Sequence, residues 1–266
     1  MKPLFFVLLL VSSFCSANVE LAPLIDEIEH ALIDREAPCP YIVAIGGCPG
    51  VGKSTITKTF QTELAKRNIR SVIFSLDHYR MSQEERKQFT NELDPRRLRW
   101  EKLHAALIKI KNGALEITKP TVNQLTTELG EETLYLEGID CILFDGAYAL
   151  NNLPPMNYLQ YADLAVYLEA SIESIYCWKW ERDLKKTTPR TSHEFFHHMQ
   201  LSVEDFAIYI YPTRKNAHFI IHIDPLHHYS VLKNDLISTF PTPDFTEFRL
   251  QALNHYKGDS LTHLTQ

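Results

Sequence analysis

The stretch AIGGCPGVGKST, residues 44–55, decides how the rest of the sequence is interpreted. The pattern G-x-x-x-x-G-K-[ST] is satisfied within it by Gly47, Gly52, Lys53 and Ser54. A β-rich run precedes the glycines and a helical pattern follows them, which is the context that this pattern requires. Glycines let backbone N–H groups turn onto phosphates, and a helix N-terminus adds favourable potential. The stretch therefore predicts a site for nucleotide phosphates.

The phosphate loop is expected to bind ATP together with Mg²⁺. Lys53 can reach the outer phosphates and stabilise charge on the transferring group, and Ser54 can offer its hydroxyl to magnesium. Cys48 is expected to be a tolerated small side chain rather than a redox switch, although a helix N-terminus can lower a thiol pKa. The residues expected to contact the nucleotide are Gly47, Cys48, Pro49, Gly50, Val51, Gly52, Lys53, Ser54 and Thr55.

Two carboxylates follow predicted strands at the same edge as the loop. Asp145 ends the apolar run CILFD, where the second magnesium-holding group of a phosphate-loop enzyme belongs. Asp77 follows the run VIFSL and is placed to accept a proton from a substrate hydroxyl. Either carboxylate taken alone could be a helix or turn cap. Together with the loop, they indicate a phosphoryl-transfer site.

Strands alternate with helices along the chain, which is typical of parallel pairing in a layered α/β sheet. Strands are predicted at residues 41–45, 72–76, 141–145, 164–168 and, as the last one, 218–223. Helices are predicted over 19–35, from 100 to the turn at 113, from near 171 and 191, and over 244–256. A short hairpin or an irregular segment is expected over 114–137. We expect residues 18–266 to form a single α/β domain of three layers around a central parallel sheet.

Composition and the N-terminus bear on partners and location. The 266 residues carry a formal charge of -6, which argues against a general nucleic-acid binder. Residues 1–17 resemble a signal peptide, and their apolar run, 4–11, is too short to span a bilayer. Export conflicts with the cytosolic location of ATP, so the sequence does not decide the compartment. It does not decide the oligomeric state either.

From Tyr41 to Ile223, the order of motifs resembles the uridine kinase and phosphoribulokinase group of P-loop kinases. The segment SLDHYR, residues 75–80, is similar to the group's S-x-D-x-F/Y motif. LFDGAYAL, residues 143–150, is similar to its strand-end EGI motif, with aspartate in place of glutamate. KWERDL, residues 179–184, is similar to its R-x-x-R-D lid helix, and YIYPTRKNAHFII resembles its segment before the last strand.

The resemblance implies a P-loop NTPase fold with a helical lid at about 179–198. It implies a uridine kinase-like enzyme that transfers the γ-phosphoryl group of ATP to a small-molecule hydroxyl. Asp77 would be the catalytic base, and Asp145 would hold magnesium. Arg182 would close over the ATP phosphates beside Lys179, and Tyr79 would line the acceptor site. Further helpers on the lid would be Lys185, Lys186 and Arg190.

Departures from the group concern the acceptor. Uridine kinases have a Y-D-F-x-x-H-x-R run that binds ribose and base, where this chain has VNQLTTEL, residues 122–129. Their ribose-binding aspartate is replaced by Arg99 or a neighbour. These changes argue against uridine. Arg96, Arg97 and Arg99 would suit an anionic acceptor such as a sugar phosphate or an acid, and a solvated helix face is the alternative interpretation.

Two other functions remain open from the sequence. His193, Glu194 and His197 match the H-E-x-x-H pattern of zinc peptidases, and with a signal peptide this gives an exported metallopeptidase. Thr191 and Glu194 are also spaced as a helix capping box, which explains the glutamate structurally. The second alternative is a protein that binds ATP without catalysis. The remaining scattered histidines, among them His227, are assigned no role.

Overall fold

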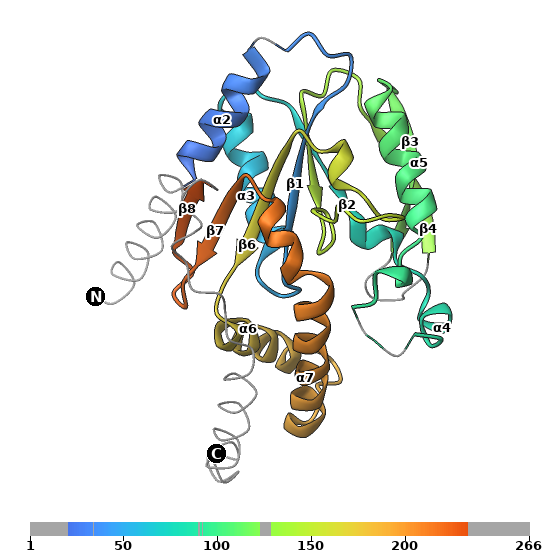
Figure 1. The fold of residues 1–266 in the computed structure, drawn as a ribbon, viewed down its shortest axis with the longest axis vertical. Helices are drawn as coiled ribbons and strands as arrows, with labels where there is room; N and C mark the ends of the chain where they lie inside the picture. The colour runs from blue at the N-terminus through green and yellow to red at the C-terminus, as the bar shows by residue number, and fades with distance from the viewer. Residues whose placement is uncertain (1–20, 34, 90, 92, 123–128, 234–266) are drawn as a thin grey trace, which may run out of the picture.

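A six-stranded sheet organises the chain in the computed structural model, which describes residues 21–233 apart from 34, 90, 92 and 123–128 (Figure 1). The predicted leader, 1–17, and the predicted helix over 244–256 lie outside these residues. The strands run in the order β2-β5-β1-β6-β7-β8, and all neighbours are parallel except β7 and β8. Their bounds are β1 Tyr41–Gly47, β2 Ser71–Ser75, β5 Cys141–Asp145, β6 Leu164–Glu169, β7 Phe219–Ile223 and β8 Tyr229–Lys233.

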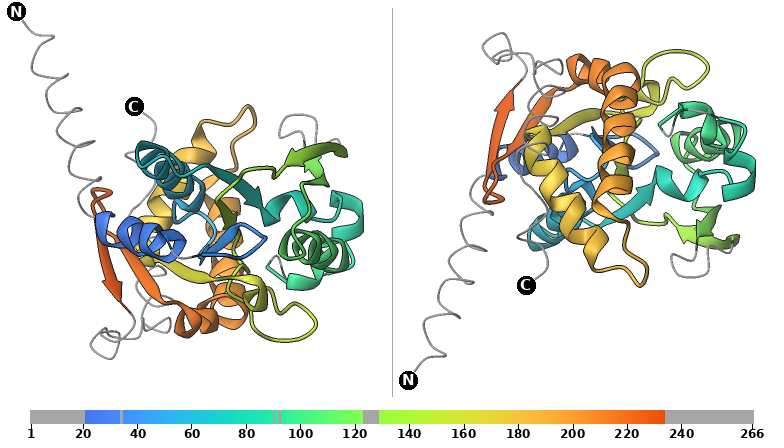
Figure 2. Two further views of the ribbon diagram at one scale, coloured as in Figure 1. Left: turned by 90° about the horizontal axis from the view of Figure 1, so that it is seen from above. Right: turned by 90° about the horizontal axis from the view of Figure 1, so that it is seen from below.

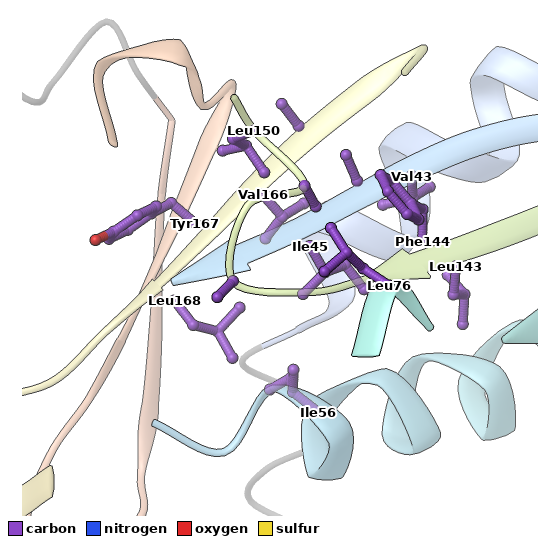
Figure 3. Close-up of a cluster of buried hydrophobic side chains, with 14 of the residues drawn as sticks. Val43, Ile45, Ile56, Leu76, Leu143, Phe144, Leu150, Val166, Tyr167 and Leu168 are labelled. Atoms are coloured by element: carbon purple, nitrogen blue, oxygen red, sulfur yellow. The ribbon is translucent and has the colours of Figure 1, made fainter. Parts of the chain in front are cut away.

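Strand β1 lies at the centre of the core. Its seven residues are all buried, because β5 and β6 flank it and both faces of the sheet are covered. The unbroken apolar runs of β1 and β5 are typical of parallel strands buried on two faces. Figure 3 shows side chains of β1, β5 and β6 meeting Ile56 and Leu150 in one apolar cluster. The predicted central parallel sheet is confirmed.

Helices α2 (Ala22–Ile33) and α3 (Lys53–Lys66) lie on one side of the sheet (Figures 1 and 2). α2 buries Leu24, Ile25 and Ile28, as the helical spacing over 19–35 predicts for the part that the structure describes. α5 (Trp100–Lys111) ends before Gly113 as predicted, and its His104 bonds to the hydroxyl of Tyr161 at 2.9 Å. The short elements are η1 Leu76–Tyr79, α4 Gln83–Arg86, η2 Pro95–Arg97, η3 Leu159–Tyr161 and η4 Tyr211–Asn216.

Two strand features refine the sequence prediction. The segment 114–137 contains an antiparallel hairpin of β3 (Glu116–Val122) and β4 (Leu129–Tyr135), which forms its own small sheet. The prediction that 218–223 is the last strand is wrong. β8 follows it and pairs antiparallel with β7, because Asp224 closes a tight turn by accepting from the backbone N–H groups of Leu226 and His228.

Helices α6 (Ile172–Leu184) and α7 (Ser192–Tyr209) cross below the carboxyl ends of the strands (Figures 1 and 2). Together with the turn between them, α6 and α7 contain the predicted lid segment, about 179–198, and we refer to these two helices as the lid. Ser171 caps the first, and a capping box of Thr191 and Glu194 starts the second. No helix in the described part of the chain has the length and apolarity needed to cross a membrane.

Candidate active site

Strand register brings the loop and both predicted carboxylates to one edge of the sheet. Ile45 of β1 and Ser75 of β2 each lie opposite Asp145 of β5. The phosphate loop begins two residues after Ile45, and Asp77 lies two residues after Ser75. All three groups line one cavity of about 820 Å³, which is closed on the other side by lid residues. Such an edge is where parallel α/β sheets bind ligands.

Positive backbone φ angles explain two glycines of the loop. Gly47 has φ +133°, and a Cβ atom there would lie 2.3 Å from the carbonyl oxygen of Leu168 in the neighbouring strand. Gly52 caps α3 with φ +99° and has open space around it. A positive φ disfavours any residue with a side chain at both positions. Only at Gly47 would an added Cβ atom also clash with a backbone atom.

We expect the substitution Gly47→Ala to destabilise the fold by about 3 kcal/mol or more, because strained φ and overpacking against backbone add. The measurement is the midpoint of thermal unfolding without nucleotide. Gly52→Ala is the matched control, since it shares the positive φ but meets no atom closer than Ile223 Cδ1 at 3.9 Å. Equal losses in the two variants would contradict the steric explanation.

The amino group of Lys53 contacts the backbone of the phosphate loop. Its Nζ donates to the carbonyl oxygens of Gly47 and Cys48, each at 3.0 Å. The thiol of Cys48 is buried, and burial raises its pKa to about 11. Cys48 is therefore a protonated small side chain at neutral pH, without the thiolate that redox reactivity needs.

Asp145 and Ser54 form a polar pair behind the loop. The Ser54 hydroxyl donates to Asp145 Oδ2 at 3.1 Å. The other carboxylate oxygen, Oδ1, is buried and has no hydrogen-bond partner among the described residues. Burial raises the pKa of Asp145, against the opposing charge of Lys53. A buried carboxylate with a vacant oxygen beside a hydroxyl is an oxygen donor set that suits Mg²⁺.

Another part of the cavity wall carries Asp77 and two arginines. Asp77 is exposed in η1, and Arg80 and Arg97 line the same cavity. The segment 97–99 pairs with 79–81, since the Met81 N–H donates to the Arg97 carbonyl at 2.9 Å and the Arg99 N–H donates to that of Tyr79 at 2.8 Å. This pairing places Arg80 and Arg97 on adjacent backbone segments.

Three predicted acceptor residues lie away from this cavity. Arg96 turns outward, 68% exposed, and binds the buried carboxylate of Asp94. Tyr79 is 1% exposed and packs edge-to-face on Phe74, with ring centroids 5.7 Å apart. Arg99 binds Glu85 at 2.7 Å. Both Tyr79 and Arg99 line a second cavity, of about 550 Å³, beside the β3–β4 hairpin.

The lid brings two of its predicted cations to the cavity. Lys179 and Arg182 of α6 both line it, and the stem of Lys179 packs on Gly50 of the loop. The predicted helpers Lys186 and Arg190 instead bind the buried carboxylate of Asp183. They organise the turn between α6 and α7, while Lys185 is exposed.

Several other residues that line the cavity were not predicted from the sequence. Trp178 of α6 stacks on His227, with ring centroids 4.5 Å apart and planes inclined by 26°. His198 and Ser202 of α7 complete the lid wall. Arg80 had a local signal, because it directly follows the S-x-D-x-F/Y segment. The other residues had none, since their positions depend on how the lid packs.

The H-E-x-x-H residues do not form a metal centre in the structure. Glu194 uses its carboxylate to accept hydrogen bonds from the N–H and hydroxyl of Thr191, both at 2.8 Å. His193 and His197 are exposed on α7. Throughout the described ranges, no group of three histidine, cysteine or acidic side chains is placed to hold a metal ion. The motif is explained by the capping box.

Comparison with known proteins gives the family. The profile described as "Phosphoribulokinase / Uridine kinase family" matches residues 42–229. A pantothenate kinase of Streptococcus suis is 25% identical over 213 residues, covering 70% of this chain and 69% of that protein. One of Mycolicibacterium vanbaalenii is 26% identical over 225 residues, covering 72% and 70%. The chain belongs to the phosphoribulokinase/uridine kinase family.

Solved structures agree on the fold. D-glycerate 3-kinase from Cryptococcus neoformans gives a TM-score of 0.59 at 12% identity, covering 81% of this chain and 97% of that one. Phosphoribulokinase from Rhodobacter spheroides gives 0.58 at 11% identity, covering 70% and 71%. The chain is an ATP-dependent kinase that transfers a phosphoryl group to a small-molecule hydroxyl. This class displaces the peptidase as an interpretation of the chain.

Proposed function

We propose that Asp77 is the catalytic base of the transfer and that Lys53, Lys179 and Arg182 bind the ATP phosphates. The acceptor oxygen forms a bond to the γ-phosphorus while the bond to the β–γ bridging oxygen breaks. That electron pair leaves with ADP, and the hydroxyl proton goes to Asp77. The observation that carries this proposal is the single cavity that Asp77 shares with the loop and the lid cations.

Ser54 and Asp145 are proposed to hold Mg²⁺. Support comes from the buried, vacant Oδ1 of Asp145 and from its hydrogen bond with Ser54. Bound magnesium would neutralise charge on the β- and γ-phosphates during transfer. These two residues would hold the cation, because α3 presents Ser54 and β5 presents Asp145 on neighbouring elements of the core.

Pantothenate is the first acceptor proposed for testing. The curated relatives named above are pantothenate kinases, and the residues by which uridine kinases bind ribose and base are absent here. The uridine kinase-like description therefore applies to the fold and the phosphate site, and we do not extend it to the acceptor.

The test is a screen for Mg-ATP-dependent ADP release with pantothenate, nucleosides, sugars and sugar phosphates. We expect pantothenate or another small hydroxyl compound to release ADP. Lys53→Ala should lower the rate by about 100-fold or more, because a preorganised charge on the transferring group is lost. Absence of Lys53-dependent release with every acceptor would contradict the proposed function. ATP binding without any transfer would favour a non-catalytic role.

A further inference from the structure

We infer that Arg80 and Arg97 bind an anionic group of the acceptor, a carboxylate or a phosphate, in the part of the cavity that η1 and residues 93–98 line. The acceptor would then be a hydroxy acid or a sugar phosphate rather than a neutral nucleoside or sugar. This inference rests on the proposed function, because it assigns the acceptor end of the same cavity.

The side chain of Arg97 is fixed by one hydrogen bond, and other N–H groups of its guanidinium have no partner among the described residues. Its Nη1 donates to the carbonyl of Asn91 at 2.9 Å, which fixes the direction of the side chain. Its Nε is buried and has no hydrogen-bond partner among the described residues. Its Nη2 group likewise makes no hydrogen bond in the part of the chain that the structure describes, and because Arg97 lines the cavity this group can donate to an oxygen of the acceptor. A planar guanidinium is also suited to bidentate binding of carboxylate or phosphate.

Arg80 supplies a second positive charge beside Asp77. Within residues 21–233 as described, its guanidinium makes no hydrogen bond or ion pair. Its backbone is fixed, since the N–H of Arg80 donates to the Asp77 carbonyl at 3.3 Å and the residue bridges to Leu98. The backbones of Asp77 and Arg80 are therefore held at a fixed spacing along one short helix and its end.

The local charge balance favours an anion. Asp94 lines the cavity, but the Arg96 guanidinium binds its carboxylate and holds the pKa of Asp94 below its usual value. Lys53, Lys179 and Arg182 lie on the phosphate side and would be matched by ATP. Among the described residues on the acceptor side, Asp77 and Asp94 face Arg80, Arg96 and Arg97, which leaves an excess of one positive charge.

The segment that carries Arg97 is anchored from behind. The Leu93 N–H donates to the buried carboxylate of Asp205 on α7 at 2.9 Å. The hydroxyl of Tyr148 donates to the Leu93 carbonyl. Asn91 donates to the hydroxyl of Tyr209 at 3.3 Å. These contacts from α7 and from the end of β5 preorganise the arginine, so that little ordering is needed when the acceptor binds.

The experiment compares matched pairs of acceptors that differ in one anionic group. Carboxylates are tested with pantothenate against its alcohol and with D-glycerate against glycerol, and phosphate with ribulose 5-phosphate against ribulose. We expect one anionic member to be preferred over its neutral partner by about 10-fold or more in kcat/KM. Arg97→Gln and Arg80→Gln should each raise KM for that acceptor by about 10- to 100-fold, the loss of a charge-assisted bond. KM for ATP should remain nearly unchanged.

Three controls keep the outcomes distinct. Arg70→Gln, at the exposed opposite end of β2, should leave the preference intact. Arg97→Lys should restore part of it, because the charge remains. KM for ATP and the thermal midpoint identify a variant that merely misfolds. Transfer to neutral acceptors with equal efficiency, or arginine variants that affect both members equally, would overturn the inference alone. No Lys53-dependent transfer to any acceptor would overturn the proposed function itself.

Discussion

Asp77→Asn is expected to lower kcat by about 100- to 10,000-fold while the affinity for ATP is retained, because loss of a general base removes that much rate. Asp77 is exposed and sits after β2, two residues beyond the register position of Asp145. Its replacement therefore disturbs neither the core nor the phosphate loop. The measurements are steady-state kinetics with the acceptor found in the screen and binding of a non-hydrolysable ATP analogue.

Asp26→Asn serves as the matched control for Asp77→Asn. Asp26 is an exposed carboxylate of α2 that binds Arg67 and does not line the cavity. The control should keep the kcat of the unaltered protein. A kcat for Asp77→Asn within about threefold of the unaltered protein would rule out the base assignment, because general-base catalysis is worth at least about 100-fold.

Asp145→Asn is expected to abolish most transfer and at the same time to raise the thermal stability of the nucleotide-free protein. Activity should fall by about 100-fold or more, since the substitution removes a proposed ligand of the cation that would neutralise the reacting phosphates. Stability should rise because burial raises the pKa of Asp145, so its charged form is penalised in the fold. Asparagine removes the charge and keeps an oxygen that can accept from Ser54. Each 1 kcal/mol gained would raise the midpoint by about 2–4 °C.

The pH dependence of the free energy of unfolding shows whether the charge of Asp145 destabilises the fold. A carboxylate whose pKa is raised in the folded state destabilises the fold when ionised. For Asp145, the penalty is absent below the ordinary value of 3.8 and complete above the raised pKa. Between these values, the unaltered protein should lose stability as pH rises, relative to Asp145→Asn. Thermal melts across this range, with and without Mg-ADP, measure it. A lower midpoint for Asp145→Asn at neutral pH would contradict the buried-charge explanation.

The phosphate loop and the sheet edge could be predicted from the sequence because their signals are local. The glycine pattern, the lysine and the two apolar runs that end near Asp77 and Asp145 all lie within short stretches. Parallel pairing then requires their carboxyl ends to meet. The capping box at Thr191 was likewise visible as a short-range pattern, and the hairpin over 114–137 was one of the two structures expected for that segment.

The acceptor side could not be predicted residue by residue. In the sequence, nothing distinguishes the roles of Arg96, Arg97 and Arg99. Their side chains point in different directions because of the η2 turn and the pairing of residues 97–99 with residues 79–81. The aromatic ring of Tyr79 turns into the core because Phe74 packs against it. Strand β8 was missed for a similar reason, since its pairing depends on the turn that Asp224 closes.

The buried face of α2 sets a limit on trimming of the N-terminus. Leu21, which directly precedes α2, and Leu24, Ile25 and Ile28 within it are each at most 1% exposed. Each such side chain contributes about 1.5–3 kcal/mol, so four of them approach the entire stability of an ordinary domain. A protease or a leader peptidase that cuts after residue 17 leaves these anchors in place. A cut beyond Ile28 would remove them and uncover the apolar surface of α3 beneath, so the boundary of the foldable kinase lies upstream of its nucleotide loop by more than 20 residues.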